Sequence, residues 1–186
     1  DADGALSRAR AAGVDRLLVV GITAENCREV VEFARERSGV YCILGIHPCE
    51  TAAASDSDWD LVCQLAREDK VVGVGETGID LYWDDSPQDV QEVWLERHIE
   101  LALALGLPLV LHIRDGFEPA RKVLAPHVDR GLLGVIHCFG GQPDDVHPFL
   151  EWGWPISFSG ILTYTKAENV REAARRTPLA QCLVET

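Results

Sequence analysis

The sequence has no methionine among its 186 residues, and positive charge is scarce in it. Because a newly translated chain starts with methionine, we expect this one to be a processed product or a piece, cut at both ends. Seventeen basic residues against 30 acidic ones leave a formal net charge of -13, which argues against broad electrostatic attraction to nucleic acid. Apolar runs such as 101–105 and 107–111 are far shorter than the ~18 to 20 residues of a membrane span, so we expect no membrane partner.

No Cys-x-x-Cys pair occurs, although the chain has six cysteines. A chain of this length can build a core without disulfides, so scattered cysteines predict free thiols in a reducing compartment, the cytoplasm. The phosphate-binding pattern Gly-x-Gly-x-x-Gly is also missing after the first apolar run, where Gly21-Ile22-Thr23 follows Val20. A doubly wound open sheet is therefore only the alternative fold.

Short apolar runs rich in β-branched residues predict seven parallel strands, covered on both faces because they are nearly all apolar. These runs are Leu17–Val20, Tyr41–Ile46, Val71–Val74, Leu107–Leu111, Leu132–Ile136, Pro155–Phe158 and Cys182–Val184. Strand starts lie ~27 residues apart, which is typical of the α/β units of a TIM (β/α)8-type barrel. We find no linker or charge block that divides the chain, so residues 1–186 are expected to form a single barrel domain.

Amphipathic helical segments alternate with the strands. They are Ala24–Arg37, Ser57–Glu68, Pro87–Leu105, Gly116–Leu124, Pro143–Glu151 and Ala167–Arg176, with a further one before Gly13. The clearest begins with Ser86 as the expected N-cap and Pro87 as its first residue, and Gly106 ends it.

Polar side chains follow the ends of the strands, where barrel enzymes collect their catalytic groups. They are His47, Glu76, His112, His137 and Glu185. A single histidine there often only bonds the next loop, but two imidazoles and a carboxylate at one rim form a ligand set for Zn, Mn or Fe. A metal in such a site lowers the pKa of a bound water and polarises an ester or phosphoryl group, so a hydrolytic role follows. Glu76 has two oxygens with which to bridge two ions.

The Arg114-Asp115 pair, which follows the expected ligand His112, allows two interpretations. Arg114 can neutralise a phosphate and Asp115 can orient an imidazole, or the two can form a local salt bridge. Tyr82 and Trp83 can line a substrate mouth. We expect surface positions for His98, His127 and His147, and packing roles for Trp59, Trp94 and Trp152.

Six motifs in order make the chain similar to the TatD-type metal-dependent deoxyribonucleases, which are amidohydrolase-like barrel hydrolases. They are Gly45-Ile46-His47-Pro48, Gly73-Val74-Gly75-Glu76-Thr77-Gly78-Ile79-Asp80, Leu111-His112-Ile113-Arg114-Asp115, His137-Cys138-Phe139, Ile156-Ser157-Phe158-Ser159-Gly160 and Leu183-Val184-Glu185-Thr186. The resemblance spans essentially the whole chain.

The resemblance implies an eight-stranded barrel that binds two divalent ions (Mg, Mn or Zn) and cleaves DNA, often from an end, through metal-activated water. It implies that Glu76, His112 and His137 are metal ligands and catalytic residues, with Glu76 bridging the ions. His47 would lie near the substrate, and we expect Arg114 and Asp115 to contact it too. With so acidic a chain, single-stranded ends are the easier DNA substrate.

The chain departs from the family pattern at three positions. An Asp-x-His-x-His motif on the family's first strand and an Asp after Glu185-Thr186 are not in it. We therefore expect strands two to eight of the barrel, with the first strand and the C-terminal helix missing. Such a chain should bind at most one ion, weakly, through Glu76, His112 and His137, and should hydrolyse DNA poorly or not at all.

Two alternatives stay open. The chain can be an amidohydrolase-type enzyme for a small-molecule amide or lactone, which its negative charge favours. It can also be a catalytically impaired fragment that acts only as a folded or binding module. Activity on an oligonucleotide with Mg or Mn that is lost in Glu76→Ala separates these alternatives from the nuclease.

Overall fold

A computed structural model describes residues 1–185, and Thr186, the last residue of the sixth motif, lies outside them. Seven parallel strands form one sheet in the sequential order β1 to β7. The strands are β1 (Leu17–Gly21), β2 (Val40–Leu44), β3 (Val71–Asp80), β4 (Leu109–Arg114), β5 (Gly134–His137), β6 (Ile156–Phe158) and β7 (Cys182–Val184). Sequential order is that of a barrel, so the doubly wound alternative is wrong.

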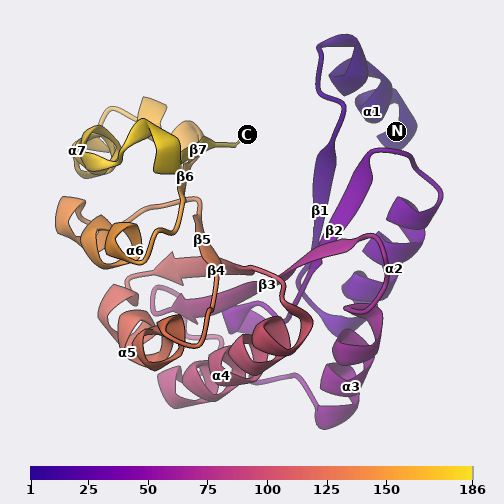
Figure 1. The fold of residues 1–186 in the computed structure, drawn as a ribbon, viewed down its shortest axis with the longest axis horizontal. Coiled ribbons are helices and arrows are strands. Elements are labelled where there is room, and N and C mark those ends of the chain that lie inside the picture. Colours follow the sequence, from indigo (N-terminus) through magenta and orange to yellow (C-terminus); the bar gives the residue numbers. More distant parts are fainter. Residues whose placement is uncertain (186) are drawn as a thin grey trace.

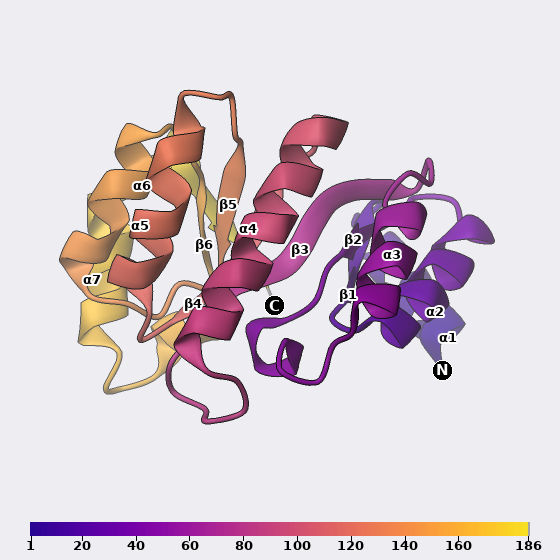
Figure 2. The same ribbon diagram turned by 90° about the horizontal axis from the view of Figure 1, so that it is seen from below.

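The helices lie on the outside of the curved sheet (Figures 1 and 2). The α-helices are α1 (Ala2–Ala11), α2 (Ala24–Arg35), α3 (Asp56–Leu65), α4 (Gln88–Leu105), α5 (Phe117–Val128), α6 (His147–Glu151) and α7 (Glu168–Arg176). Short 3-10 helices cover Pro48–Glu50 (η1), Pro143–Val146 (η2), Gly160–Thr163 (η3) and Leu179–Gln181 (η4). The segment predicted at 143–151 is therefore split between η2 and α6. None of the helices in residues 1–185 is long and apolar enough to cross a membrane.

The curved sheet matches seven strands of a TIM-type barrel, as the sequence predicted. Within residues 1–185 the pairing runs from β1 at one edge to β7 at the other, and these two strands are not paired with each other. In Figure 1, β1 and β2 lie to the right of β6 and β7. Apolar side chains between sheet and helices form the core, in which Leu44, Leu95, Leu109 and Leu111 have no exposed surface.

The start of α4 differs from its prediction. The N-cap is Pro87, not Ser86, because the Ser86 side chain is turned inward. Its hydroxyl lies 2.7 Å from the hydroxyl of Thr51, and both residues are buried. Gly106 ends the helix in a left-handed conformation, as predicted.

Two histidines expected at the surface are buried. His98 has no exposed surface, because it lies on the face of α4 that packs on the sheet. His127 is 8% exposed, because α5 continues through Pro126 to Val128 and carries His127 against Glu96 of α4. His147 is exposed as predicted, with 54% of its side-chain surface accessible. Trp94 is buried, and Trp59 and Trp152 pack against the core.

Candidate metal centre

His112, on β4, lies between two carboxylates. Its Nε2 is 2.8 Å from Oδ2 of Asp80, and its Nδ1 is 3.4 Å from Oε1 of Glu76. Asp80 is fully buried, and its other oxygen accepts the backbone N–H groups of Tyr82 and Trp83. A carboxylate that accepts the Nε2 proton leaves the Nδ1 lone pair of His112 facing Glu76.

His137, at the end of β5, has the same arrangement with a different carboxylate. Its Nδ1 is 2.7 Å from Oε2 of Glu185, and its Nε2 is 3.5 Å from the same Oε1 of Glu76. The second oxygen of Glu185 is buried and has no hydrogen-bond partner within residues 1–185. Each imidazole is thus held by a carboxylate at one nitrogen and turns the other nitrogen toward Glu76.

A bulge in β3 places Glu76 at this point. Gly75 pairs with Val110 and Thr77 with Leu111, so Glu76 is an extra residue in the strand. The sequence prediction ended this strand at Val74, but pairing with β4 resumes after the bulge and continues to Asp80.

Gly78 allows the extended part of β3 to lie close to His112. It has a φ of +144°, and a Cβ atom there would lie 1.9 Å from the carbonyl oxygen of His112. Any side chain at this position would therefore disturb the strand that carries the metal-facing histidine.

His47 completes a group of three metal-competent side chains. One ligand atom each from His47, Glu76 and His112 all lie within 4.8 Å of one another. The His47 ring is 4.4 Å from the His112 ring, and its Nδ1 accepts the N–H of Cys49 at 3.3 Å. The resemblance placed His47 near the substrate, and the geometry makes it a candidate ligand as well.

The carboxylates and imidazoles of the centre shift one another's pKa values. Burial raises the pKa of Glu76, but the hydrogen bond to His112 and the nearby His137 outweigh it, so the net pKa is lowered. Burial lowers the pKa of His112, and its bonds to Glu76 and Asp80 more than compensate, so the net pKa is raised. Burial and the neighbouring His112 lower the pKa of His47.

These residues fit a divalent cation. Imidazole nitrogens and a shared carboxylate oxygen are the ligand types of Zn, Mn and Fe sites. The buried second oxygen of Glu185, which lies beside His137, meets no donor among the described residues, and a buried acceptor of this kind fits a nearby cation.

Arg114 and Asp115, the other residues expected to contact the substrate, line a cavity together with Glu76 and His112. Their arrangement differs from the two that the sequence suggested. Arg114 stacks its guanidinium 3.6 Å above the ring of Tyr82. In the described part of the chain no salt bridge joins Arg114 to Asp115. The carboxylate that orients His112 is Asp80 rather than Asp115, because β3 extends to Asp80 and pairs it with Arg114.

Sequence reasoning assigned no role to two buried residues of α4 that hold this rim. The side chain of Gln91 bonds both the N–H and the carbonyl of Asp80, at 2.8 and 2.9 Å. His98 accepts the N–H of Ile46, the residue before His47, at 2.9 Å. The seven-residue spacing of Gln91 and His98 puts them on one helix face, which is the only signal that the sequence offers.

Comparison with known proteins identifies the family of the chain. A family model described as TatD related DNase matches residues 1–186. The chain is 30% identical to the uncharacterized metal-dependent hydrolase YabD of Bacillus subtilis, over all of this chain and 73% of YabD. It is 30% identical to a 3'-5' ssDNA/RNA exonuclease TatD of Klebsiella pneumoniae, over all of this chain and 71% of that protein. The crystal structure of YjjV, a TatD homologue from Escherichia coli, superposes with a TM-score of 0.93 at 34% identity, covering all of this chain and 72% of YjjV.

Proposed function

The chain belongs to the family of TatD-related DNases, and from that premise we propose that this metal-dependent hydrolase cleaves phosphodiester bonds of DNA at single-stranded ends. One observation carries the proposal. His112 and His137 are each held by a carboxylate at one nitrogen, and each turns the other nitrogen toward Oε1 of Glu76. That arrangement orients ligand atoms toward a common point before any ion arrives.

We propose that Glu76, His112 and His137 are the metal ligands and catalytic residues, with His47 beside them. A bound divalent ion there would polarise a phosphoryl oxygen and lower the pKa of a water molecule. Asp80 and Glu185 hold the two imidazoles in the tautomers that leave their ligand nitrogens free. The sequence expectation of a single ion on this chain is part of the proposal and is open to calorimetry.

The charge distribution supports a single strand rather than a duplex. A chain at -13 gives little general attraction to a phosphate backbone, so phosphates must be bound locally. Arg114 lies in the same cavity as Glu76 and His112 and is a local cation for that purpose. The Klebsiella relative is named a 3'-5' exonuclease of ssDNA and RNA, and we propose the same polarity here.

The six cysteines are free thiols in the structure, and Cys27 and Cys42 are buried. Burial raises the pKa of the Cys27 thiol to about 12, which keeps it protonated and unreactive. We propose the reducing cytoplasm as the compartment.

The test is digestion of a 5'-labelled single-stranded oligonucleotide with Mg²⁺ or Mn²⁺. The proposal predicts a ladder of shortening products, formed slowly because this chain is expected to bind at most one ion. The ladder should be lost in Glu76→Ala and retained in the control Glu151→Ala, an exposed carboxylate outside the cavity. Hydrolysis of small amides or lactones without any ladder would instead favour the amidohydrolase alternative. Inactivity on both, with Mn²⁺ still bound, would favour a binding module.

A further inference from the structure

A cavity of 750 Å³ opens over the candidate metal centre, within the size range of small-molecule sites. Glu76, His112 and His137 line it together with two groups of larger side chains. Arg114 is the last residue of β4, Tyr82 lies in the loop after β3, and Tyr164 and Lys166 come from the loop between η3 and α7. The cavity thus joins the metal centre to two basic and two aromatic side chains.

Arg114 is fixed in place without being neutralised. Its guanidinium lies 3.6 Å from the centre of the Tyr82 ring and 5.8 Å from that of Trp83. Stacking holds the plane of the guanidinium and leaves its N–H groups available to an anion. Within residues 1–185, no carboxylate pairs with Arg114 or with Lys166, although acidic residues outnumber basic ones by 30 to 17.

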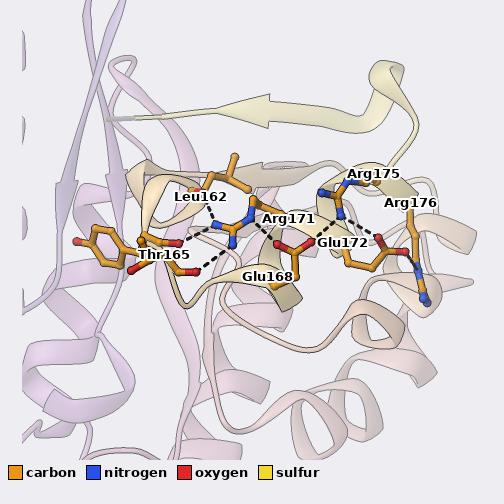
Figure 3. Close-up of polar contacts among 8 residues, drawn as sticks. Leu162, Thr165, Glu168, Arg171, Glu172, Arg175 and Arg176 are labelled. Carbon is orange, nitrogen blue, oxygen red and sulfur yellow. Dashed lines mark hydrogen bonds and ion pairs between the residues drawn. The ribbon is translucent and has the colours of Figure 1, made fainter.

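Arg171 of α7 holds the loop that carries Tyr164 and Lys166. Figure 3 shows its guanidinium packed against this loop. It donates to the carbonyl oxygens of Leu162, Tyr164 and Thr165 at 3.0, 2.7 and 3.2 Å. Glu168 holds the same guanidinium at 2.8 Å. These bonds fix the loop that carries Tyr164 and Lys166. A ligand that binds there therefore pays less conformational entropy for ordering the loop.

The exposed ring of Tyr164 is the second feature of this loop. The residue is 65% exposed, although a tyrosine has a large apolar surface that favours burial. Exposed aromatic rings on a cavity wall are the stacking surfaces that proteins offer to unpaired bases, and cations beside them bind the phosphates.

We propose that this cavity is a nucleotide subsite, in which Arg114 and Lys166 bind a phosphate and Tyr164 and Tyr82 contact the attached base and sugar. The inference rests on the proposed function, because it assigns the part of the DNA strand next to the scissile phosphate. A nucleotide combines the anion and the flat ring that these walls accept, whereas a small amide or lactone has no charge for two cations. Asp115 and, when no metal is bound, Glu76 also line the cavity and oppose the anion, so the two cations must outweigh both.

The experiment is calorimetric binding of thymidine 5'-monophosphate in EDTA, where no metal takes part, with thymidine and inorganic phosphate as separate probes. The monophosphate should bind more tightly than either probe. Arg114→Gln and Lys166→Gln should each weaken it about tenfold, because a charge-assisted bond to phosphate is lost. Tyr164→Ala should weaken it by a similar factor. Arg121→Gln and Lys122→Gln, on the outer face of α5 and paired with Glu118, should leave it unchanged.

Equal binding of the monophosphate by Arg114→Gln, Lys166→Gln and the wild-type chain would overturn the subsite, as would no binding by the wild-type chain. Digestion of the oligonucleotide with Mn²⁺ is measured on the same proteins, so that the two proposals can fail separately. If the wild-type chain binds the monophosphate through these cations but cleaves no oligonucleotide, the subsite is supported and the nuclease proposal is contradicted. If the wild-type chain cleaves the oligonucleotide but both cation variants bind the monophosphate as tightly as wild type, the nuclease proposal is supported and the subsite is contradicted.

Discussion

Nε2 of His112 lies 2.8 Å from Oδ2 of Asp80, and this pair sets which nitrogen of the imidazole faces the candidate metal centre. The buried side-chain amide of Gln91 accepts the backbone N–H of Asp80 and donates to its carbonyl oxygen. A chain of contacts therefore runs from α4 through Gln91 and Asp80 to His112. Its members are buried or half-buried, so the position of the ligand nitrogen depends on the packing of α4.

Asp80→Asn should weaken Mn²⁺ binding by about 10- to 100-fold, the usual effect of removing the carboxylate partner of a metal-binding histidine. The asparagine keeps the size and one oxygen for the N–H groups of Tyr82 and Trp83, so the fold should persist. Calorimetry measures the affinity and circular dichroism the fold. Asp84→Asn, in the exposed part of the same loop, is the control. An affinity in Asp80→Asn equal to that of wild type would contradict the role assigned to the pair.

Mn²⁺ should raise the melting temperature of the chain, because a ligand that binds only the folded state stabilises it. At 100 times the dissociation constant the gain is about 2.7 kcal/mol, or roughly 5 to 10 °C for a chain of this size. Glu76→Ala should abolish the shift, and Glu151→Ala should keep it. A shift of the same size in Glu76→Ala would place the bound ion elsewhere.

Gly78→Ala should destabilise the chain and disturb the metal centre together. The added Cβ meets the His112 carbonyl oxygen at 1.9 Å, and alanine is strained at a φ of +144°. Strain of this kind costs about 1–3 kcal/mol, and the steric overlap adds to it. Urea unfolding measures the loss. Gly140→Ala is the matched control, because a Cβ there meets no atom within 4 Å. Equal midpoints for the two variants would refute the argument.

The strands and the rim residues were predictable because each depends on local sequence. Apolar runs of three to six residues marked the strands, and polar residues directly after them marked their carboxyl ends. Glu76 and His137 were found in this way, and the structure brings both to one point with His112. Their roles as ligands remain a proposal.

The supporting residues were not predictable, because they depend on contacts between distant segments. Asp80 was missed because a bulge at Glu76 hides the continuation of β3, whose apolar pattern is broken by three glycines. His98 was assigned to the surface because helical periodicity alone does not show which polar residue finds a buried partner. Its partner, the N–H of Ile46, lies 52 residues away in the sequence.

His98 should make the stability of the chain depend on pH. It is fully buried, accepts the N–H of Ile46 and donates to the carbonyl oxygen of Trp94, so it is neutral in the folded chain. Burial is the main cause that lowers the pKa of His98 from 6.5 to about 4. Between these values the unfolded chain takes up a proton that the folded chain does not, so acidification favours unfolding.

The contribution of His98 to the free energy of unfolding should therefore be complete above about pH 6.5 and decrease down to about pH 4, by an amount on the order of 3 kcal/mol. Urea unfolding at several pH values measures it as the difference between wild type and His98→Gln, whose side chain does not titrate. That difference should shrink on acidification through this window. His147→Gln, at an exposed site, should follow the wild-type profile. A difference between wild type and His98→Gln that stays constant from pH 7 to pH 4 would show that His98 is not the neutral acceptor for Ile46.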